Sequence, residues 1–379
     1  MDRNSVTLSK SFPEHGIVDG KLHFEYAVYA LGSTLPAPLN LWGTKTCDSA
    51  RPAADDEQTE YHGTKPEAVS WLKCNQKVVE DAQSVLVVGG GALGIQFATD
   101  IADIYPSKKV TLLHSRTRVL PKYTQPMHDE VVKSMKGLNI EVILGERLDL
   151  DSTREDPPKR DEAGRRIVRT LAGRELAADL LLLCTGQSPN TQILSELDPK
   201  TLEPDSGLAH VLPTMQLGVI KAKANGAAIA NATDLGLSDV ISTLKVEDSE
   251  SATVEKGQST ISDSKHREET PYPNIFVIGD SANAFGAIQA GHTAFYQGEV
   301  AGRNVLRLVR QQEDPAASEP LEDYKPTPPG IKISLGRKHS VHESGGKVGT
   351  ADDGVDDLHA AYMWPFFGMK VEKDEDMYP

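Results

Sequence analysis

A glycine-rich turn between an apolar strand and a helix constrains this chain more than any other feature. The strand Ser84–Val88 runs directly into Gly89-Gly90-Gly91-Ala92-Leu93-Gly94, and a helix follows over 92–104. In this GxGxxG spacing, Gly89 permits the tight turn, Gly91 lets a pyrophosphate approach the backbone, and Gly94 allows close helix–strand packing. The first helical residues, Ala92 and Leu93, add backbone N–H groups at the helix N-terminus. The alternative is a glycine-rich turn that holds no ligand.

The segments after this turn continue the alternation of strand and helix. A second strand is expected over Lys109–His114, a helix over Met127–Met135, and a third strand over Ile140–Leu144. Such alternation predicts an α/β fold with a parallel, doubly wound sheet. The helix over 92–104 is expected to bury one face, which carries Leu93, Phe97, Ile101 and Ile104.

The end of the second strand indicates which nucleotide is preferred. A site for NAD places an acidic residue about 20 residues beyond the glycines, where it binds the ribose hydroxyls. This chain has His114 there, followed by Arg116 and Arg118, and no carboxylate. His and Arg side chains suit a 2′-phosphate, which favours NADPH over NADH. The alternative is that both arginines are ordinary surface charges.

Three further strands end in glycine. The runs 24–33 and 179–187 close on Gly32 and Gly186, and the run 274–279 closes on Gly279, which Asp280 follows. Glycine lets the backbone turn sharply or approach a ligand. An aspartate in that position accepts hydrogen bonds from sugar or ribityl hydroxyls. A helix is expected to follow over 287–310.

The remaining segments are less regular. Residues 151–166 are charged and are expected to form a hairpin tip between Ile143 and Ile167. Residues 222–270 are polar and lack aromatic side chains, which predicts a long loop or a partly disordered insertion. Residues 312–329 form a connector rich in Pro and Glu. The chain then becomes Gly-rich, aromatic and finally acidic.

Charge and cysteine content exclude several classes of function. The net charge of −15 argues against a general nucleic-acid binder. No apolar run approaches the length of a membrane span. The three cysteines, Cys47, Cys74 and Cys184, contain no CxxC pair, which makes a dithiol enzyme and a zinc site improbable. No metal site is expected, and the predicted location is the cytoplasm.

In order and type, these pieces resemble the pyridine-nucleotide/FAD oxidoreductases, in which an NAD(P) domain interrupts an FAD domain. Within that class the chain is similar to the apoptosis-inducing-factor-like branch with its ferroptosis-suppressor-type quinone reductases, especially the fungal members. The run 26–33 resembles the first strand that closes on "ATG", although Leu31 replaces the usual Thr. Residues 182–186 with Pro189-Asn190-Thr191 resemble the second such strand, and Gly279-Asp280 resembles the FAD-binding motif.

The resemblance implies two Rossmann-like dinucleotide-binding domains and a small C-terminal α+β segment. The FAD-type domain comprises 1–75 and 196–320, with 222–270 as its insertion. The NAD(P)-binding domain comprises 76–195, and the C-terminal segment comprises 321–379. The expected cofactors are FAD and NAD(P)H, with NADPH slightly favoured.

The chain departs from the family pattern at its start. The family begins with its own GxGxxG for the ADP part of FAD, and this sequence has none before residue 89. Two explanations stay open. The sequence is an N-terminally truncated fragment, in which case any targeting signal is absent with the lost part. Otherwise the protein is a degenerate relative that holds FAD weakly.

The function implied by the resemblance is hydride transfer from NAD(P)H to FAD, followed by electron transfer to a small quinone-like acceptor. No general acid or base stands out; His292, in the helix expected beside the flavin, fits a structural role better. The aromatic cluster over 359–367 either lines an acceptor pocket, touches a membrane surface, or packs on the core. The alternative function is a non-catalytic Rossmann module that binds NAD(P)H alone. The oligomeric state is not predicted.

Overall fold

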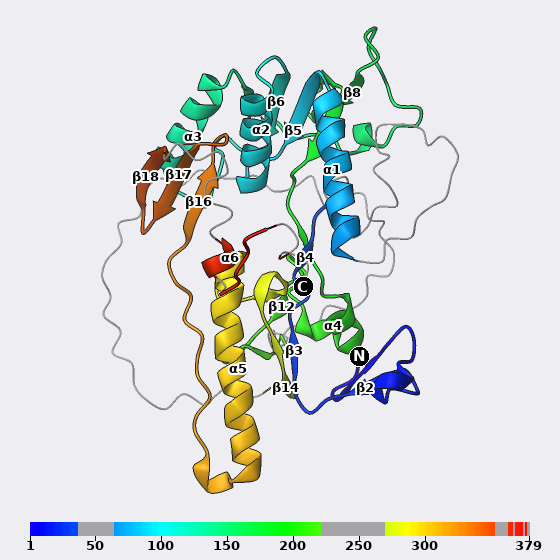
Figure 1. The fold of residues 1–379 in the computed structure, drawn as a ribbon, viewed down its shortest axis with the longest axis vertical. Coiled ribbons are helices and arrows are strands. Elements are labelled where there is room, and N and C mark those ends of the chain that lie inside the picture. Colours follow the sequence, from blue (N-terminus) through cyan, green and yellow to red (C-terminus); the bar gives the residue numbers. More distant parts are fainter. Residues whose placement is uncertain (37–63, 221–269, 353–362, 367, 374–375, 377–379) are drawn as a thin grey trace, which may run out of the picture.

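A four-stranded parallel sheet forms the upper half of the molecule in the computed structural model (Figure 1). The structure describes residues 1–36, 64–220, 270–352, 363–366, 368–373 and 376. The strand order is β10-β5-β6-β7, and every neighbouring pair is parallel. These strands are β5 (Ser84–Val88), β6 (Lys109–His114), β7 (Glu141–Leu144) and β10 (Leu180–Leu183). The predicted parallel α/β sheet is therefore confirmed.

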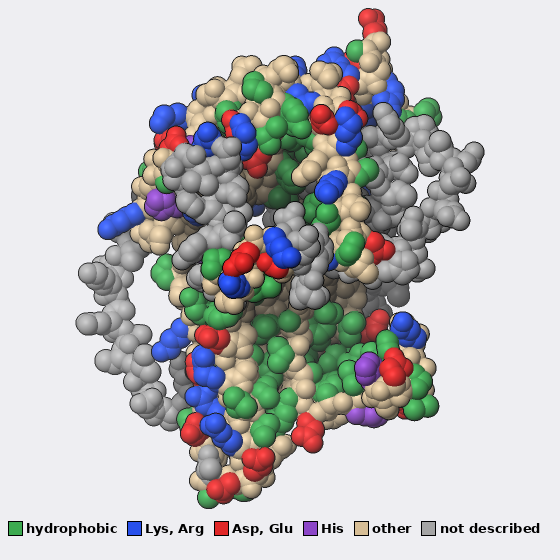
Figure 2. Space-filling model, viewed as in Figure 1, with side chains coloured by type: hydrophobic (Ala, Val, Ile, Leu, Met, Phe, Trp, Pro, Cys, Tyr) green, Lys and Arg blue, Asp and Glu red, His purple; other side chains and the backbone are tan. Residues whose placement is uncertain are grey.

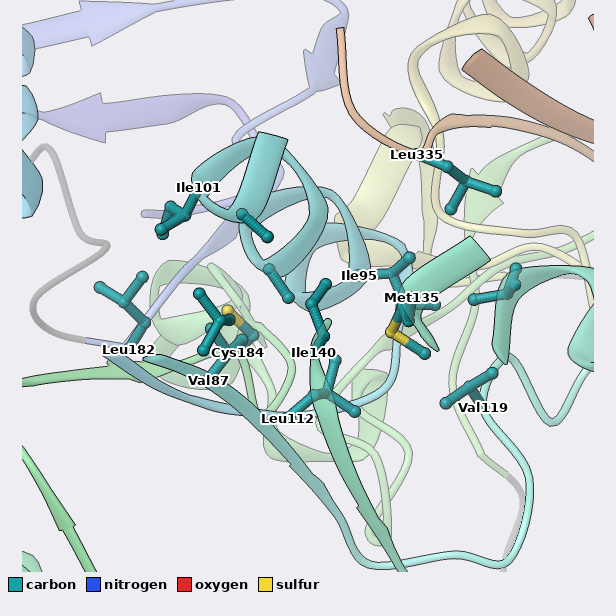
Figure 3. Close-up of a cluster of buried hydrophobic side chains, with 14 of the residues drawn as sticks. Val87, Ile95, Ile101, Leu112, Val119, Met135, Ile140, Leu182, Cys184 and Leu335 are labelled. Carbon is teal, nitrogen blue, oxygen red and sulfur yellow. The ribbon is translucent and has the colours of Figure 1, made fainter. Parts of the chain in front are cut away.

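Alternation along β5 divides the side chains between two cores. Val85 and Val87 lie in a cluster with the helices α1 (Lys65–Asp81), α2 (Ala92–Ile104) and α3 (Gln125–Gly137) on one face of the sheet. Figure 3 shows part of this cluster. Leu86 and Val88 lie in a second cluster on the opposite face, which an antiparallel hairpin covers. Its strands are β8 (Arg166–Arg169) and β9 (Glu175–Ala178).

Helix α2 begins and ends where the sequence predicted, and of its predicted face Ile101 is buried while Leu93 and Phe97 are partly buried against the core. Its buried side chains are Gly94, Ile95, Ala98, Thr99, Ile101 and Ala102. Ile104 is 48% exposed, so the predicted face that includes it is wrong at that end. Small side chains lie toward the sheet because they let the helix axis approach the strands closely.

Two other predicted elements are corrected by the structure. Residues 151–166 are not the tip of a hairpin, because β7 pairs with β6 and the hairpin is β8–β9 with its turn over 170–174. The long helix α5 runs over Gly291–Glu313 and begins four residues later than predicted. The predicted insertion 222–270 lies almost entirely outside the described residues.

A second, smaller sheet forms the lower half (Figure 1). It has the order β13-β14-β3, in which β3 and β14 are parallel and β13 is antiparallel to β14. Its strands are β3 (Ala27–Tyr29), β13 (Gln216–Leu217) and β14 (Tyr272–Val277). Helix α5 packs against it around Phe276, Val300 and Ala301.

Short elements complete this half. They are β1 (Ser5–Thr7), β2 (Lys21–His23), β4 (Ser33–Thr34), β11 (Ser188–Pro189), α4 (Gln192–Leu197), β12 (Ala209–His210) and β15 (Ala282–Asn283). Hydrophobic side chains gather on the surface of this half (Figure 2). Val28 of β3 and Phe295 and Leu306 of α5 are among the exposed ones. None of the described helices is both long enough and apolar enough to cross a membrane.

The C-terminal segment completes the upper half. It forms an antiparallel sheet of β16 (Gly330–Ser334), β17 (His339–Ser344) and β18 (Lys347–Asp352), and the short helix α6 (Met363–Phe366) follows. Ile333, Leu335 and Val341 join the core formed by α2 and α3. The buried carboxylate of Glu343 accepts hydrogen bonds from the backbone N–H and hydroxyl of Thr124, directly before α3.

The connector to this sheet runs along α5 and is fixed there by polar contacts. Buried Asn304 donates to the carbonyl oxygens of Thr214 and Glu322 at 3.0 and 2.8 Å. The Arg303 guanidinium contacts both carboxylate oxygens of Glu322 at 2.9 Å. Hydrogen bonds from Arg303 hold the pKa of Glu322 at about 2. The connector is therefore bound to the lower half although it ends in the upper half.

Asp100 of α2 faces the turn between β16 and β17. Its titration is expected to make the packing of α2 against this turn dependent on pH. Burial and the adjacent Asp103 carboxylate raise the pKa of Asp100 to about 6, and its Oδ1 has no hydrogen-bond partner in the described part of the chain. The unfolded pKa is about 3.9. Because the pKa of Asp100 is higher in the folded state, its protonated form stabilises the folded protein. This contribution to the free energy of unfolding is full below about pH 4 and is lost as the pH rises through about 6.

We expect Asp100→Asn to remove this pH dependence. The shift corresponds to about 3 kcal/mol, which solvent screening of a half-buried group reduces to about 1–2 kcal/mol. The gain in the thermal unfolding midpoint from Asp100→Asn should therefore be larger at pH 7 than at pH 4.5. Asp205→Asn, at an exposed loop position, serves as the control. Parallel pH profiles for the natural chain and Asp100→Asn would contradict the prediction.

Candidate functional site

The turn from β5 into α2 is packed so tightly that two positions accept only glycine. Gly89 has φ +123°, and a Cβ there would lie 2.0 Å from the carbonyl oxygen of Cys184. A Cβ on Gly94 would lie 2.0 Å from the carbonyl oxygen of Gly89. The glycine segment 89–91 is therefore in close contact both with the end of β10 and with the start of α2.

Gly91 differs from Gly89 and Gly94, and also from Gly90, where a Cβ would lie 2.8 Å from the His114 ring. Its φ of −85° suits any residue, and a Cβ there would meet no atom within 4 Å. The space beside Gly91 is therefore open, directly before the N-terminus of α2. The first intrahelical bond is donated by Ile95 to the Gly91 carbonyl oxygen, which leaves the N–H groups of Ala92 and Leu93 without helix partners. This geometry fits a pyrophosphate.

His114 ends β6 and holds the glycine turn in place. The Gly90 N–H donates to His114 Nδ1 at 3.0 Å, so the ring proton lies on Nε2 and is donated to the Arg118 carbonyl oxygen at 3.1 Å. Burial lowers the pKa of His114, and the Arg116 charge adds to this effect. Both ring nitrogens of a neutral His114 are thus used within the chain, and its role toward a 2′-phosphate stays a prediction.

The two arginines after β6 differ in their surroundings. The Arg118 guanidinium donates to the carbonyl oxygens of Pro121 and Tyr123 at 3.3 and 3.0 Å, so it stabilises its own loop. Arg116 is exposed. Of the two predicted arginines, Arg116 is therefore the one exposed beyond the end of β6.

Two segments of the chain cross between the halves, one through β4 and the other through β11. These crossing strands pair with each other and are joined near Gly32. Asn190 donates its backbone N–H to the Gly32 carbonyl oxygen at 2.9 Å and its side-chain amide to Leu31 O at 2.9 Å. Ser281 donates its hydroxyl to the Gly32 carbonyl oxygen at 2.7 Å. The segment after Gly279 thus lies beside the crossing point.

Asp280 brings the three glycine-closed strand ends together. Its Oδ2 accepts a hydrogen bond from the Ser33 hydroxyl and another from the Gln187 side-chain amide, each at 3.0 Å. The Gly279 N–H donates to Oε1 of buried Gln297 at 2.7 Å, which fixes the turn from α5. Gly32, Gly186 and Gly279 each precede one member of the Ser33, Gln187 and Asp280 cluster.

Ser33, Gln187 and Gln297 were not predicted as site residues from the sequence. A signal for the first two was present, because each follows a strand-closing glycine as Asp280 does. Nothing comparable marks Gln297, which lies at a buried position of α5.

The other predicted residues have different surroundings. Cys184 is free and buried, and burial raises the pKa of its thiol to about 12. Cys74 of α1 is disulfide-bonded. His292 is exposed in the first turn of α5. Trp364 packs under the Lys65 ammonium, which lies 5.6 Å from the centre of its ring. Tyr362 and Phe367 lie outside the described residues.

Comparison with known proteins points to one family. The model of the family described as "Pyridine nucleotide-disulphide oxidoreductase" matches residues 2–210 of this chain. The chain is 37% identical to Fe-regulated protein 8 of Mycosarcoma maydis, over 93% of this chain and 69% of that protein. It is 26% identical to ferroptosis suppressor protein 1 of Taeniopygia guttata, over 90% of this chain and 74% of that protein.

A solved structure has a similar fold. The chain aligns with the HOCl-induced flavoprotein disulfide reductase RclA of Escherichia coli with a TM-score of 0.50 and 15% identity. The alignment covers 90% of this chain and 54% of that one, so this chain spans about half the length of that reductase. At this identity the likeness concerns the fold alone.

Gly91→Asp should abolish nucleotide binding and leave the fold intact. The new side chain enters open space, so the thermal unfolding midpoint should stay within about 2 °C, a shift below about 1 kcal/mol. The added charge would occupy the predicted pyrophosphate position. Binding is measured by calorimetric titration with NADPH. Gly94→Ala is the converse control, since its Cβ strikes Gly89 and lowers stability. Unchanged affinity in Gly91→Asp would contradict the site assignment.

Proposed function

The chain belongs to the pyridine nucleotide-disulphide oxidoreductase family, and from this we propose that it passes electrons from NADPH through FAD to a quinone-like acceptor. The family makes it an FAD-dependent NAD(P)H oxidoreductase. NADPH and the quinone-like acceptor are our proposals. One observation carries the proposal. The segments that follow Gly32, Gly186 and Gly279 meet at Asp280, and the chain also has the complete glycine turn 89–94.

We propose that the open turn at Gly91 holds the nucleotide. The unpaired N–H groups of Ala92 and Leu93 and the dipole of α2 stabilise negative charge beside it. Gly89 and Gly94 keep the turn in the shape that leaves this space open. His114 supports the same shape through its contact with Gly90.

The cluster around Asp280 supports an FAD site. Both hydrogen bonds of the cluster reach Oδ2, so Oδ1 keeps its capacity to accept a hydrogen bond from a hydroxyl of the bound flavin. The glycines Gly32, Gly186 and Gly279 have φ values of +63°, +111° and +72°, which let the backbone turn away at each strand end. When bound, FAD supplies hydride acceptance and electron transfer, chemistry that no side chain here provides.

The preference for NADPH rests on Arg116. An exposed guanidinium beyond the end of β6 matches a 2′-phosphate in charge and in donor geometry. His114 replaces the carboxylate that would repel such a phosphate. The neutral imidazole adds no charge of its own, so the discrimination falls to Arg116.

The acceptor is proposed to be a small diffusible molecule. Cys184 lies against the dinucleotide turn, and a buried thiol with a pKa of about 12 does not provide a thiolate at neutral pH. Disulfide chemistry at this position therefore has no support. A quinone is proposed from the family resemblance, and the proposed location is the cytoplasm, with peripheral membrane contact at most.

Arg116→Ala should weaken NADPH binding about tenfold, which corresponds to the loss of one charge-assisted contact. The affinity for NADH should change less than about twofold, because NADH lacks the 2′-phosphate. Both dissociation constants are measured by titration of nucleotide fluorescence. Lys122→Ala removes an exposed cation from the same loop and is the control. An equal loss for both nucleotides would refute the role of Arg116.

The proposed activity is tested by visible absorption of the purified protein, before and after addition of FAD and then of NADPH without oxygen. We expect a flavin band that NADPH bleaches and that a quinone restores. A protein that binds NADPH but no flavin would instead be the non-catalytic nucleotide-binding module considered above.

A further inference from the structure

Gln187 connects the nucleotide half of the molecule to the acidic residue of the flavin motif. It follows Gly186, where the chain leaves the upper sheet after β10. Its side-chain amide donates to Asp280 Oδ2 at 3.0 Å across 93 residues of sequence. Ser33 reaches the same oxygen at 3.0 Å from the other crossing strand, across 247 residues.

We propose that Gln187 is a positioning residue for Asp280, which holds the carboxylate so that Oδ1 faces the flavin hydroxyls. This inference rests on the proposed function. Two donors on one oxygen limit the rotation of the carboxylate group, and donors to a charged acceptor are the stronger kind. Ser33 belongs to β4, whereas Gln187 lies directly before β11, in the segment that returns from the upper sheet.

The local backbone explains why Gln187 can serve in this way. Asn190, three residues later, is bonded to Gly32 and to Leu31, so the returning strand is fixed against the first crossing strand. Tyr29 donates its hydroxyl to the Asn190 carbonyl oxygen at 2.6 Å, which adds a third contact. The backbone that carries Gln187 is therefore held close to Asp280 before any ligand binds.

The test compares Gln187→Glu with Gln187→Lys at the same position. Glutamate replaces the donor with a repelling carboxylate, whereas lysine keeps an N–H donor. We expect the dissociation constant of FAD, measured by flavin fluorescence, to rise at least about tenfold in Gln187→Glu and less than about threefold in Gln187→Lys. The midpoint potential of the bound flavin should shift in Gln187→Glu only. Gln192→Glu adds the same charge at an exposed position of α4 and should change neither quantity.

A double-mutant cycle tests the Gln187–Asp280 contact without flavin. Unfolding midpoints are measured for Gln187→Leu, Asp280→Asn and the double variant in the apoprotein. If the contact exists, the double variant loses less than the sum of the two single losses. Additive losses would overturn the inference. So would normal FAD affinity and an unchanged flavin potential in Gln187→Glu.

The outcomes separate this inference from the proposed function. A natural chain that takes up no FAD contradicts the proposed function, and with it the role of Gln187 toward flavin, whatever the cycle shows. A natural chain that binds FAD and is bleached by NADPH, together with an unaffected Gln187→Glu, keeps the function and removes Gln187 from it.

Discussion

The close approach of three backbone segments at Gly89 is the constraint on which the upper half of the molecule depends. The end of β10, the turn after β5 and the first turn of α2 meet there, at distances that leave no room for a side chain on Gly89 or Gly94. The same approach orders the free N–H groups at the start of α2 around an open space at Gly91. Packing that is required for the fold thus leaves an open space beside backbone N–H groups without using any charged side chain.

The lower half depends on polar contacts between distant segments. Two crossing strands and the segment after β14 are joined through Asn190, Gly32 and Asp280, and most of these bonds involve a backbone group or a neutral side chain. Asp280 is the charged member, and its Oδ2 receives two donors. This arrangement places a carboxylate where the three glycine-closed strand ends meet.

Local sequence patterns predicted the parallel sheet and the strand–turn–helix unit, because both arise from neighbours in the chain. The exposure of Ile104 was not predicted, because hydrophobicity placed it on the buried face, whereas the close helix–strand distance favours Gly94, Ala98 and Ala102 there. The β8–β9 hairpin was not predicted, although Gly173 in its short turn, with φ +86°, is a local signal for it. Gln187 was missed because its partner lies 93 residues away, although both residues follow a glycine. The roles assigned to the glycines, His114, Arg116 and Asp280 stay predictions.

The contribution of the C-terminal sheet to the upper core has a consequence for biosynthesis. The parallel strands are complete once residue 183 has been made, but Ile333, Leu335 and Val341 are part of the same buried cluster. On the ribosome, α2 and α3 must therefore keep an apolar surface exposed until β16 and β17 have been translated. That nascent surface is the part of the chain that chaperones would be expected to cover. The last strands to emerge then close a core that was begun among the first.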